Sequence, residues 1–385
     1  MDLADFQNEI YLSGLGGAVP DLPTDLHRLE ELAAARLTPQ AHGYVAGAAG
    51  AERTADANLA AFDQWRIVPR MLRDVAERDF STTVLGTEMP APVIIGPVGV
   101  LRILHPDGEL AVARAAKALG VTVTLSTAAS TTLEEVAAEA GPRWYQLYWP
   151  KDRELAASLV HRAAEAGYTA LVVTLDTFAM AWRPRDLDRA YLPFLRGIGV
   201  QNYWSDPVFQ KAVGGPVTDA NRDLALLHWV ANFGNPSLTW DDLAWLRRQW
   251  DGPIVLKGIQ HVDDARRAVD AGMDGIVVSN HGGRQVDGAI ASLDALPAIA
   301  SEVGALTTVL FDSGIRSGAD VAKALALGAK AVLIGRPYAY GLGLAGEDGV
   351  RHVLRSLMAE LDLTLALAGR STLADVGPDL LSRRP

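Results

Sequence analysis

One short run of residues, Ser279-Asn280-His281-Gly282-Gly283-Arg284-Gln285, combines several groups that can do chemistry. It follows the apolar residues 275–278, a pattern typical of a buried parallel strand. A histidine can take up a proton near neutral pH, and the arginine three residues later can bind a carboxylate through two parallel hydrogen bonds. The glycines allow a tight turn and the close approach of a flat ligand. Taken alone, the run is equally compatible with an ordinary glycine-rich turn.

These groups need elements that bring them together, and the chain supplies a repeating pattern. Strands are expected at residues 92–96, 122–127, 143–148, 170–176, 253–258, 275–280, 307–314 and 331–335. Helices are expected at residues 109–119, 132–140, 153–166, 240–250, 262–271, 293–303, 319–327 and 350–368, several of them ending in glycine. Strand then helix, repeated eight times, predicts an α/β fold, the (β/α)8 TIM barrel. A doubly wound sheet is the alternative, but no first turn carries its dinucleotide fingerprint.

Two regions interrupt this alternation. Residues 1–91 are predicted to form an N-terminal helical segment of two or three helices and a short strand pair, with Thr38 capping a helix that begins at Pro39. Residues 178–238 form a long insertion after the fourth strand, with a helix near 221–231. An insertion of this length at the top of a barrel predicts a lid or an assembly surface. We therefore expect a single domain over 1–385, with the barrel at 92–177 and 239–369.

Composition narrows the class of protein. Of the 385 residues, 49% are hydrophobic, which is ample for a large core, yet no apolar run approaches the length of a membrane span. The N-terminus has no secretion signal, so a soluble cytoplasmic enzyme is expected. The absence of cysteine excludes disulfides, thiolate zinc sites and cysteine nucleophiles. A net charge of −11 argues against nucleic acid or an anionic membrane as a partner, and no metal site is predicted.

Barrel active sites form at the carboxyl ends of the strands, and polar residues gather there in this sequence. The ring comprises Ser126, Gln146, Tyr148, Thr174, Asp176, Lys257, Ser279, His281, Arg284, Asp312, Arg316 and Arg336. A complete ring that includes several cations, in an acidic protein, favours a binding site over packing. Such a local basic cluster would draw in an anionic substrate.

The last two strand ends predict a phosphate site. Residues 312–318 and 334–337 place glycine amides, Arg316 and Arg336 after strands seven and eight, where barrels commonly bind phosphate. Asp312 would repel a phosphate, so we expect it to accept hydrogen bonds from ribityl or ribose hydroxyls. Lys257 would lie further in, where its charge could stabilise an anion on a flat ring. A salt bridge to a neighbouring carboxylate and a Schiff-base lysine are the alternatives for Lys257.

The sequence resembles the FMN-dependent 2-hydroxy-acid oxidases and dehydrogenases over essentially its whole length. The resemblance rests on residues 279–285 together with Gln146-Leu147-Tyr148, Leu256-Lys257-Gly258, Phe311-Asp312-Ser313-Gly314 and Ile334-Gly335-Arg336-Pro337. It implies FMN as the cofactor, a small 2-hydroxy acid and O2 as the reactants, and a homo-oligomer, either a tetramer or an octamer.

The resemblance also implies roles for individual residues. His281 would be the catalytic base, with Lys257 and Tyr148 also catalytic. Tyr44, Tyr148, Arg183, His281 and Arg284 would bind the substrate, the two arginines gripping its carboxylate. FMN would contact Pro97, Val98, Gly99, Ser126, Gln146, Thr174, Lys257, Ser279, Asp312, Ser313, Gly314, Arg316, Gly335 and Arg336. From the residues alone, Tyr44 fits equally an aromatic packed between N-terminal helices, and Arg183 fits a surface arginine on the insertion.

Within the family the resemblance is greatest to the lactate 2-monooxygenases, through residues 8–11, 182–187 and 206–211. The implied reaction converts L-lactate and O2 to acetate, CO2 and water, because pyruvate stays in the closed site during reoxidation. Faster release would give pyruvate and H2O2, the oxidase alternative. Trp182, Ala128 and Gly99 depart from the glycolate-oxidase pattern, and Gly99 is expected to leave space beside the flavin. A Schiff-base aldolase and an inactive binding homologue are the other classes considered.

Overall fold

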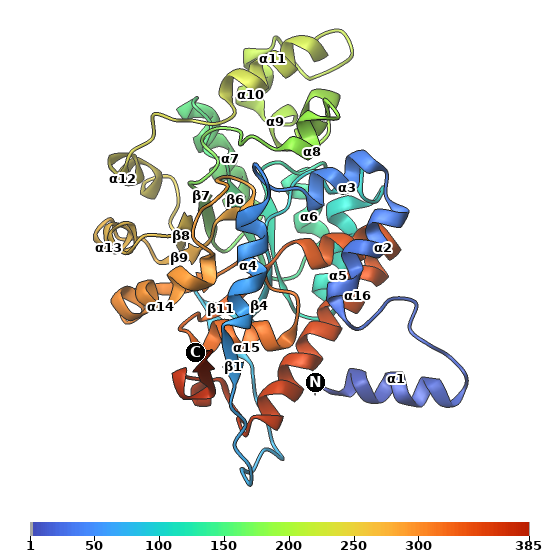
Figure 1. Ribbon diagram of the computed structural model, residues 1–385. Coiled ribbons are helices and arrows are strands. Elements are labelled where there is room, and N and C mark those ends of the chain that lie inside the picture. Colours follow the sequence, from blue (N-terminus) through green and yellow to red (C-terminus); the bar gives the residue numbers. More distant parts are fainter. Residues whose placement is uncertain (1–2, 385) are drawn as a thin grey trace.

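The computed structural model describes residues 3–384 and contains a closed barrel of parallel strands surrounded by helices (Figure 1). The barrel strands are β4 (Val93–Ile95), β5 (Thr122–Ser126), β6 (Arg143–Leu147), β7 (Leu171–Thr174), β8 (Ile254–Ile259), β9 (Gly275–Val278), β10 (Thr308–Phe311) and β11 (Ala331–Ile334). Each pairs with the next in chain order, and β11 closes the ring on β4. The predicted TIM barrel is confirmed, with every expected strand in place.

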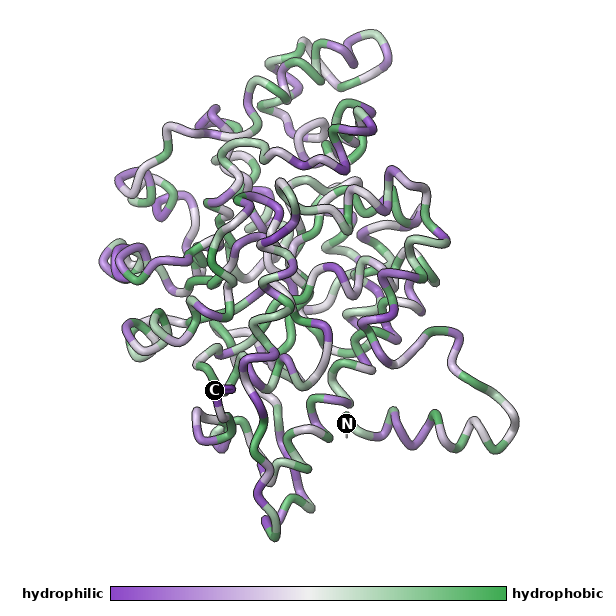
Figure 2. Tube along the Cα trace, viewed as in Figure 1, coloured by the Kyte–Doolittle hydropathy of each residue, from purple (hydrophilic) through white to green (hydrophobic). Residues whose placement is uncertain are grey.

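Alternating burial explains why these short apolar runs form a barrel. Residues that point to its axis, among them Ile94, Trp144, Val172, Val277 and Leu333, pack into one buried cluster. Their neighbours along each strand point outward and pack under the helices. The central strands are mostly hydrophobic, and hydrophilic residues gather on peripheral helices such as α13 (Figure 2). This packed interior gives the strand ends a rigid platform.

The barrel helices are α5 (Gly108–Ala118), α6 (Leu133–Glu139), α7 (Arg153–Glu165), α12 (Leu243–Arg247), α13 (Val262–Asp270), α14 (Ser292–Val303), α15 (Gly318–Ala326) and α16 (Arg336–Leu367). The glycines expected to end α5, α7, α13 and α15 all have positive φ, from 66° to 108°, as left-handed caps require. The last predicted helix, 350–368, matches the second part of α16, after a kink at which Ala345 and Gly346 have non-helical backbone angles; the first part, which begins at Arg336, was not predicted. Its glycines lower the helix propensity of the first part. In the structure, Gly341 and Gly349 pack backbone to backbone, and a Cβ on Gly341 would lie 2.6 Å from the Gly349 carbonyl oxygen.

Over residues 3–91 the N-terminal segment holds four α-helices, where two or three were predicted: α1 (Asp5–Leu15), α2 (Leu29–Arg36), α3 (Pro39–Ala46) and α4 (Arg53–Asp63). Thr38 caps α3 as predicted, because its side chain accepts a hydrogen bond from the Ala41 amide at 3.2 Å. The predicted strand pair is the hairpin of β2 (Thr82–Val84) and β3 (Thr87–Met89), whose apolar residues join the barrel interior. A second pair joins β1 (Trp65–Ile67) to β12 (Leu381–Arg383), and α1 projects away from the barrel (Figure 1).

The insertion between β7 and α12 contains α8 (Pro184–Leu187), α9 (Gln201–Trp204), α10 (Pro207–Ala212) and α11 (Arg222–Asn232) (Figure 1). The helix predicted near 221–231 is confirmed as α11. Asn202 is fully buried and ties the insertion to the barrel: its Nδ2 donates to the Thr127 carbonyl at 3.1 Å, and its Oδ1 accepts from the Leu133 amide at 2.8 Å. Among the described residues, no helix is both long and apolar enough to cross a membrane.

Candidate active site

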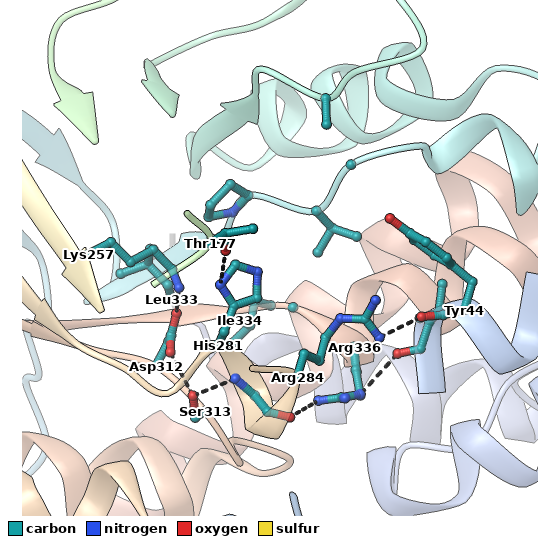
Figure 3. A pocket seen from close by; sticks show the side chains of 18 of the residues that line it. Tyr44, Thr177, Lys257, His281, Arg284, Asp312, Ser313, Leu333, Ile334 and Arg336 are labelled. Carbon is teal, nitrogen blue, oxygen red and sulfur yellow. Dashed lines mark hydrogen bonds and ion pairs between the residues drawn. The ribbon is translucent and has the colours of Figure 1, made fainter. Parts of the chain in front are cut away.

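One cavity, called here the main cavity, lies at the carboxyl ends of the barrel strands and collects most of the predicted site residues (Figure 3). Of the predicted residues, its lining includes Tyr44, Pro97, Val98, Gly99, Tyr148, Arg183, Lys257, His281, Arg284, Asp312, Ser313, Gly314, Arg316, Gly335 and Arg336. The loops after six strands, the helix α3 and the insertion all contribute. Residues far apart in sequence therefore meet where the strand order predicts that they should.

Four predicted residues, Ser126, Gln146, Thr174 and Ser279, are buried at the strand ends and do not line this cavity. Ser126 Oγ donates to Gln146 Oε1 at 2.9 Å, and Ser279 Oγ accepts from Lys257 Nζ at 2.8 Å. Thr174 lines a second cavity between the ends of the insertion, which shares Tyr148, Thr177 and Met180 with the main cavity. These four residues are therefore buried next to the residues that line the main cavity.

His281 is held in an unusual backbone conformation. Its φ is 59°, a left-handed value that costs free energy for a residue with a side chain. Ser279 Oγ accepts from the His281 amide at 3.0 Å, and Ser313 Oγ accepts from the Gly282 amide at 2.9 Å. This turn directs the imidazole into the main cavity (Figure 3).

The imidazole is oriented by a carboxylate that the sequence analysis left without a role. His281 Nδ1 lies 2.8 Å from Asp176 Oδ1 and 3.3 Å from Thr177 Oγ1. Because Nδ1 is engaged by Asp176, Nε2 is the nitrogen available to a bound substrate. Asp176 ends the fourth predicted strand, and its place beside the other strand-end residues was the available signal.

Burial decides the charge state of this pair. It lowers the pKa of His281, Lys257 and Arg183 lower it further, and Asp176 only partly opposes them. Burial alone would raise the pKa of Asp176, but His281 and Lys257 outweigh it and the pKa is lowered. At neutral pH the pair is therefore a neutral imidazole beside an ionised carboxylate, the state a base requires.

Replacing Asp176 with asparagine is expected to weaken this base. Loss of the charged partner lowers the pKa of His281 further, so the acid limb of the pH–rate profile moves to lower pH. Losing a hydrogen bond to a charged group predicts a fall in kcat of about 10–100-fold. Full pH–rate profiles would measure both effects, with Asp264→Asn as the control because Asp264 lines only the second cavity. An acid limb that stays in place would contradict the assignment.

Arginines dominate the charge of the main cavity. Arg284 Nη1 donates to the carbonyls of Tyr44 and Gly47, both at 2.6 Å, and Arg336 donates to the carbonyls of Val45, Gly47 and Gly282. Within residues 3–384, neither these two nor Arg183 and Arg316 form an ion pair with a carboxylate. Half-buried cations without a carboxylate partner favour the binding of an anion.

The pKa values of two of these arginines reflect their burial and the repulsion between neighbouring guanidinium groups. Burial, with a contribution from Arg284, lowers the pKa of Arg183 to about 10. Burial likewise lowers the pKa of Arg336 to about 10, with contributions from Arg284 and Arg316. A carboxylate near Arg183 and Arg284, and a phosphate near Arg316 and Arg336, would each relieve this repulsion.

Tyr44 and Arg183, for which the sequence left a purely structural role possible, both line the main cavity. Tyr44, on α3, faces Arg284, whose guanidinium carbon lies 5.1 Å from the ring centroid. Arg183 is half-buried and donates from Nε to the Arg284 carbonyl at 3.0 Å. Neither is therefore only a packing aromatic or a surface arginine.

Lys257 both forms a salt bridge and lines the main cavity, which were two of the roles predicted for it. Its Nζ lies 2.9 Å from Asp312 Oδ2, which is the neighbouring-carboxylate alternative, and its side chain also lines the main cavity. Although burial opposes it, the charges of Asp312 and Asp176 raise the pKa of Lys257, so the amine stays protonated. A protonated amine is a poor nucleophile, which argues against a Schiff base. Asp312, expected to accept hydrogen bonds from ribityl hydroxyls, is paired with Lys257.

Gly99 does not leave the open space that the sequence suggested. A Cβ at this position would lie 2.9 Å from both the Cβ and the carbonyl oxygen of Ala128. The same carbonyl accepts a hydrogen bond from the Val100 amide at 2.9 Å. The expectation was wrong because Ala128 already occupies this side, so glycine permits close packing of two strand-end loops.

A family model described as FMN-dependent dehydrogenase matches residues 33–383. The chain belongs to this family. It is 48% identical over 389 residues to an FMN-dependent alpha-hydroxy acid dehydrogenase, qulF, of Penicillium citrinum, across 100% of this chain and 96% of that protein. It is 42% identical to an L-lactate oxidase of Lysinibacillus sphaericus, across 90% of this chain and 89% of that protein. The protein is thus an FMN-dependent 2-hydroxy-acid oxidoreductase.

A solved structure and a further relative support this membership. A mandelate oxidase with (S)-4-hydroxymandelic acid superimposes with a TM-score of 0.84 at 40% identity, over 94% of this chain and 99% of that chain. The human 2-Hydroxyacid oxidase 1 is 43% identical over 92% of this chain and 95% of that protein. The site therefore stands on a scaffold shared with enzymes named for 2-hydroxy acids.

The residues of the main cavity, together with Gln146 buried at the end of β6, fit FMN. Among the described residues, Gln146 Nε2 is buried without a hydrogen-bond partner, and such a donor suits a carbonyl of a flavin ring. Lys257, Arg316 and Arg336 also line the main cavity, where Lys257 would offer positive charge to the ring and the two arginines would offer it to the phosphate. Gly314, with φ of 96°, allows the strand-end loop to turn where a Cβ would lie 2.5 Å from the Asn58 carbonyl.

Proposed function

We propose that this protein oxidises L-lactate with O2 to acetate, CO2 and water, as a lactate 2-monooxygenase. The observation that carries the proposal is the roof over the substrate end of the main cavity. Met180, Arg183, Phe194 and Phe233 of the insertion, together with Tyr148, line that end. Such a roof favours keeping a small product in place.

Each polar group has a task in binding and proton transfer. Arg183 and Arg284 would bind the substrate carboxylate, and Tyr44 and Tyr148 would hydrogen-bond to it. His281 Nε2 would then take a proton from the substrate, either from the hydroxyl or from the α-carbon. FMN, when bound, supplies the two-electron acceptor. The ammonium of Lys257 is preorganised beside the expected position of the ring.

The roof is built to resist opening. The ring centroids of Phe194 and Trp229 lie 4.7 Å apart, those of Trp229 and Phe233 lie 4.8 Å apart and those of Phe194 and Phe233 lie 5.9 Å apart, so the three rings pack as one compact cluster. Asn202 ties the same insertion to the end of β5. Slow release would keep pyruvate in the site while the two electrons taken from lactate reduce O2 to H2O2, and attack of H2O2 on pyruvate yields acetate, CO2 and water. Rapid release would yield pyruvate and H2O2 instead.

The second candidate is an L-lactate oxidase. It is favoured by the relative of that name and by the exposure of Trp182, which is 74% exposed at the start of the insertion. A roof whose first segment is this exposed could open between turnovers. The two candidates share every step before product release, so only the products separate them.

Replacing Phe233 with alanine is expected to shift the products. Removing one ring of this aromatic cluster opens the roof, so the fraction of pyruvate and H2O2 should rise severalfold over that of the unaltered protein. Aerobic turnover with L-lactate, with acetate, pyruvate and H2O2 quantified together, would measure the fraction. Leu227→Ala is the matched control, since this α11 side chain is 69% exposed.

The products of the unaltered protein distinguish the two candidates in the same assay. Acetate without H2O2 is the expected result. Stoichiometric pyruvate and H2O2 would make it an oxidase and refute the retention argument. We also propose a cytoplasmic location and assembly as a tetramer or octamer. Gel filtration with light scattering would test the assembly.

A further inference from the structure

The side chain of Gln285 joins two parts of the site. Its Oε1 accepts a hydrogen bond from Arg183 Nη2 at 2.5 Å, and its Nε2 donates to the backbone carbonyl of Asp176. Nε2 also lies 3.5 Å from the carbonyl oxygen of Ala179. One amide therefore contacts the arginine proposed to bind the substrate carboxylate and the residue that orients the base.

Gln285 does not face the substrate. It is half-buried and lines the second cavity, whereas Arg183 and His281 line the main cavity. Any effect of Gln285 on catalysis must therefore pass through its two partners. We propose that Gln285 is a positioning residue that fixes the guanidinium of Arg183 relative to the His281–Asp176 pair. This inference rests on the proposed function for the role of Arg183 alone.

Arg183 depends on this contact because the segment that carries it is exposed, although its own side chain is half-buried. It lies between Trp182 and α8 and close in sequence to Met180. The side chain of Trp182 is 74% exposed and that of Met180 is 52% exposed. Its Nε is held by the Arg284 carbonyl, so Gln285 is the partner that fixes Nη2. Without Gln285, the guanidinium could turn about its terminal bonds and lose the orientation that a bidentate carboxylate contact needs.

The two bonds require an amide. Position 285 must offer an acceptor to Arg183 and a donor to the Asp176 carbonyl, and a glutamine does both. Glutamate would place a second acceptor against that carbonyl, and its charge would compete with the substrate for Arg183. Methionine has similar length but neither group. These two substitutions therefore remove the link in different ways.

The test uses the FMN-loaded protein and oxalate, a small carboxylate anion that needs no turnover. Oxalate binding is followed by the change in flavin absorbance for Gln285→Met and Gln285→Glu. Loss of a hydrogen bond to a charged group predicts a dissociation constant raised about 10–100-fold. The KM for L-lactate should rise in parallel, with a smaller fall in kcat. Hydrogen exchange over residues 178–190 should become faster in Gln285→Met.

Gln260→Met is the matched control. Gln260 lines the same second cavity, and its Nε2 donates to the Ile290 carbonyl at 2.9 Å, away from Arg183 and Asp176. Its oxalate affinity, KM and exchange should stay unchanged.

The outcomes separate this inference from its alternatives. Unchanged oxalate affinity in both Gln285 variants would overturn it, even if the melting temperature fell, because the role would then be structural. A fall in kcat alone would overturn the link to Arg183. If the unaltered protein binds oxalate but does not oxidise L-lactate, the proposed function fails, whereas the positioning role stays testable by binding.

Discussion

Replacing His281 with asparagine is expected to lower kcat for L-lactate by about 10²–10⁴-fold, the usual contribution of a positioned base. Asparagine tolerates the left-handed backbone that His281 adopts at φ of 59°, so the turn should survive the change. FMN content should also stay normal, because the phosphate end of the cavity is untouched. The loss would then belong to proton transfer and not to folding.

Anaerobic single-turnover reduction of the bound flavin is the measurement that isolates this step. His161→Asn is the matched control, since His161 lies exposed on α7. A variant that reduces its flavin at the normal rate would show that another group takes the proton. A variant that has lost FMN would have to be reloaded before its rate could be compared.

The acid limb of the pH profile should report the same base. Burial, together with Lys257 and Arg183, lowers the pKa of His281 from its usual 6.5. The neutral imidazole is the active form, so kcat/KM should be level at neutral pH and fall as the pH drops through that lowered pKa. The His281→Asn variant should lose this limb. A limb centred above 6.5 would contradict the lowered pKa.

Sequence alone could place the strands because each barrel strand is a short, mostly apolar run, and polar residues follow most of these runs closely. The same logic located Lys257 and Asp312, which directly follow such runs, and His281 and Arg336, which lie two or three residues beyond theirs. Strand order then brings consecutive ends together around a closed ring. This part of the site follows from local patterns and the topology rule.

Pairwise contacts between loops could not be predicted in this way. The sequence does not reveal that Asp176 contacts Nδ1 of His281, or that Gln285 accepts a hydrogen bond from Arg183 of the insertion. The first half of α16 was missed because glycine lowers helix propensity, and only the packed structure shows what those glycines accommodate. The expectation for Gly99 was wrong for the related reason that the space around a glycine depends on its neighbour, Ala128.

Lys257→Met should be the most damaging single change to stability in the site. The side chain of Lys257 is 4% exposed and that of Asp312 is 14% exposed, so the change leaves a carboxylate buried without its cation. Breaking a buried pair in this way costs about 3–5 kcal/mol of unfolding free energy. Chemical denaturation of the variant and of the unaltered protein would measure the loss.

The double variant Lys257→Met/Asp312→Leu separates structure from catalysis. Removing both charges should restore the unfolding free energy, because a buried pair replaced by apolar residues is commonly neutral or stabilising. Turnover should nevertheless stay low, by about 10²–10³-fold, if the ammonium stabilises charge during the reaction. Recovery of turnover along with stability would reduce Lys257 to the salt-bridge alternative. A stable but slow enzyme would instead assign its charge to the chemistry, since the fold would no longer depend on it.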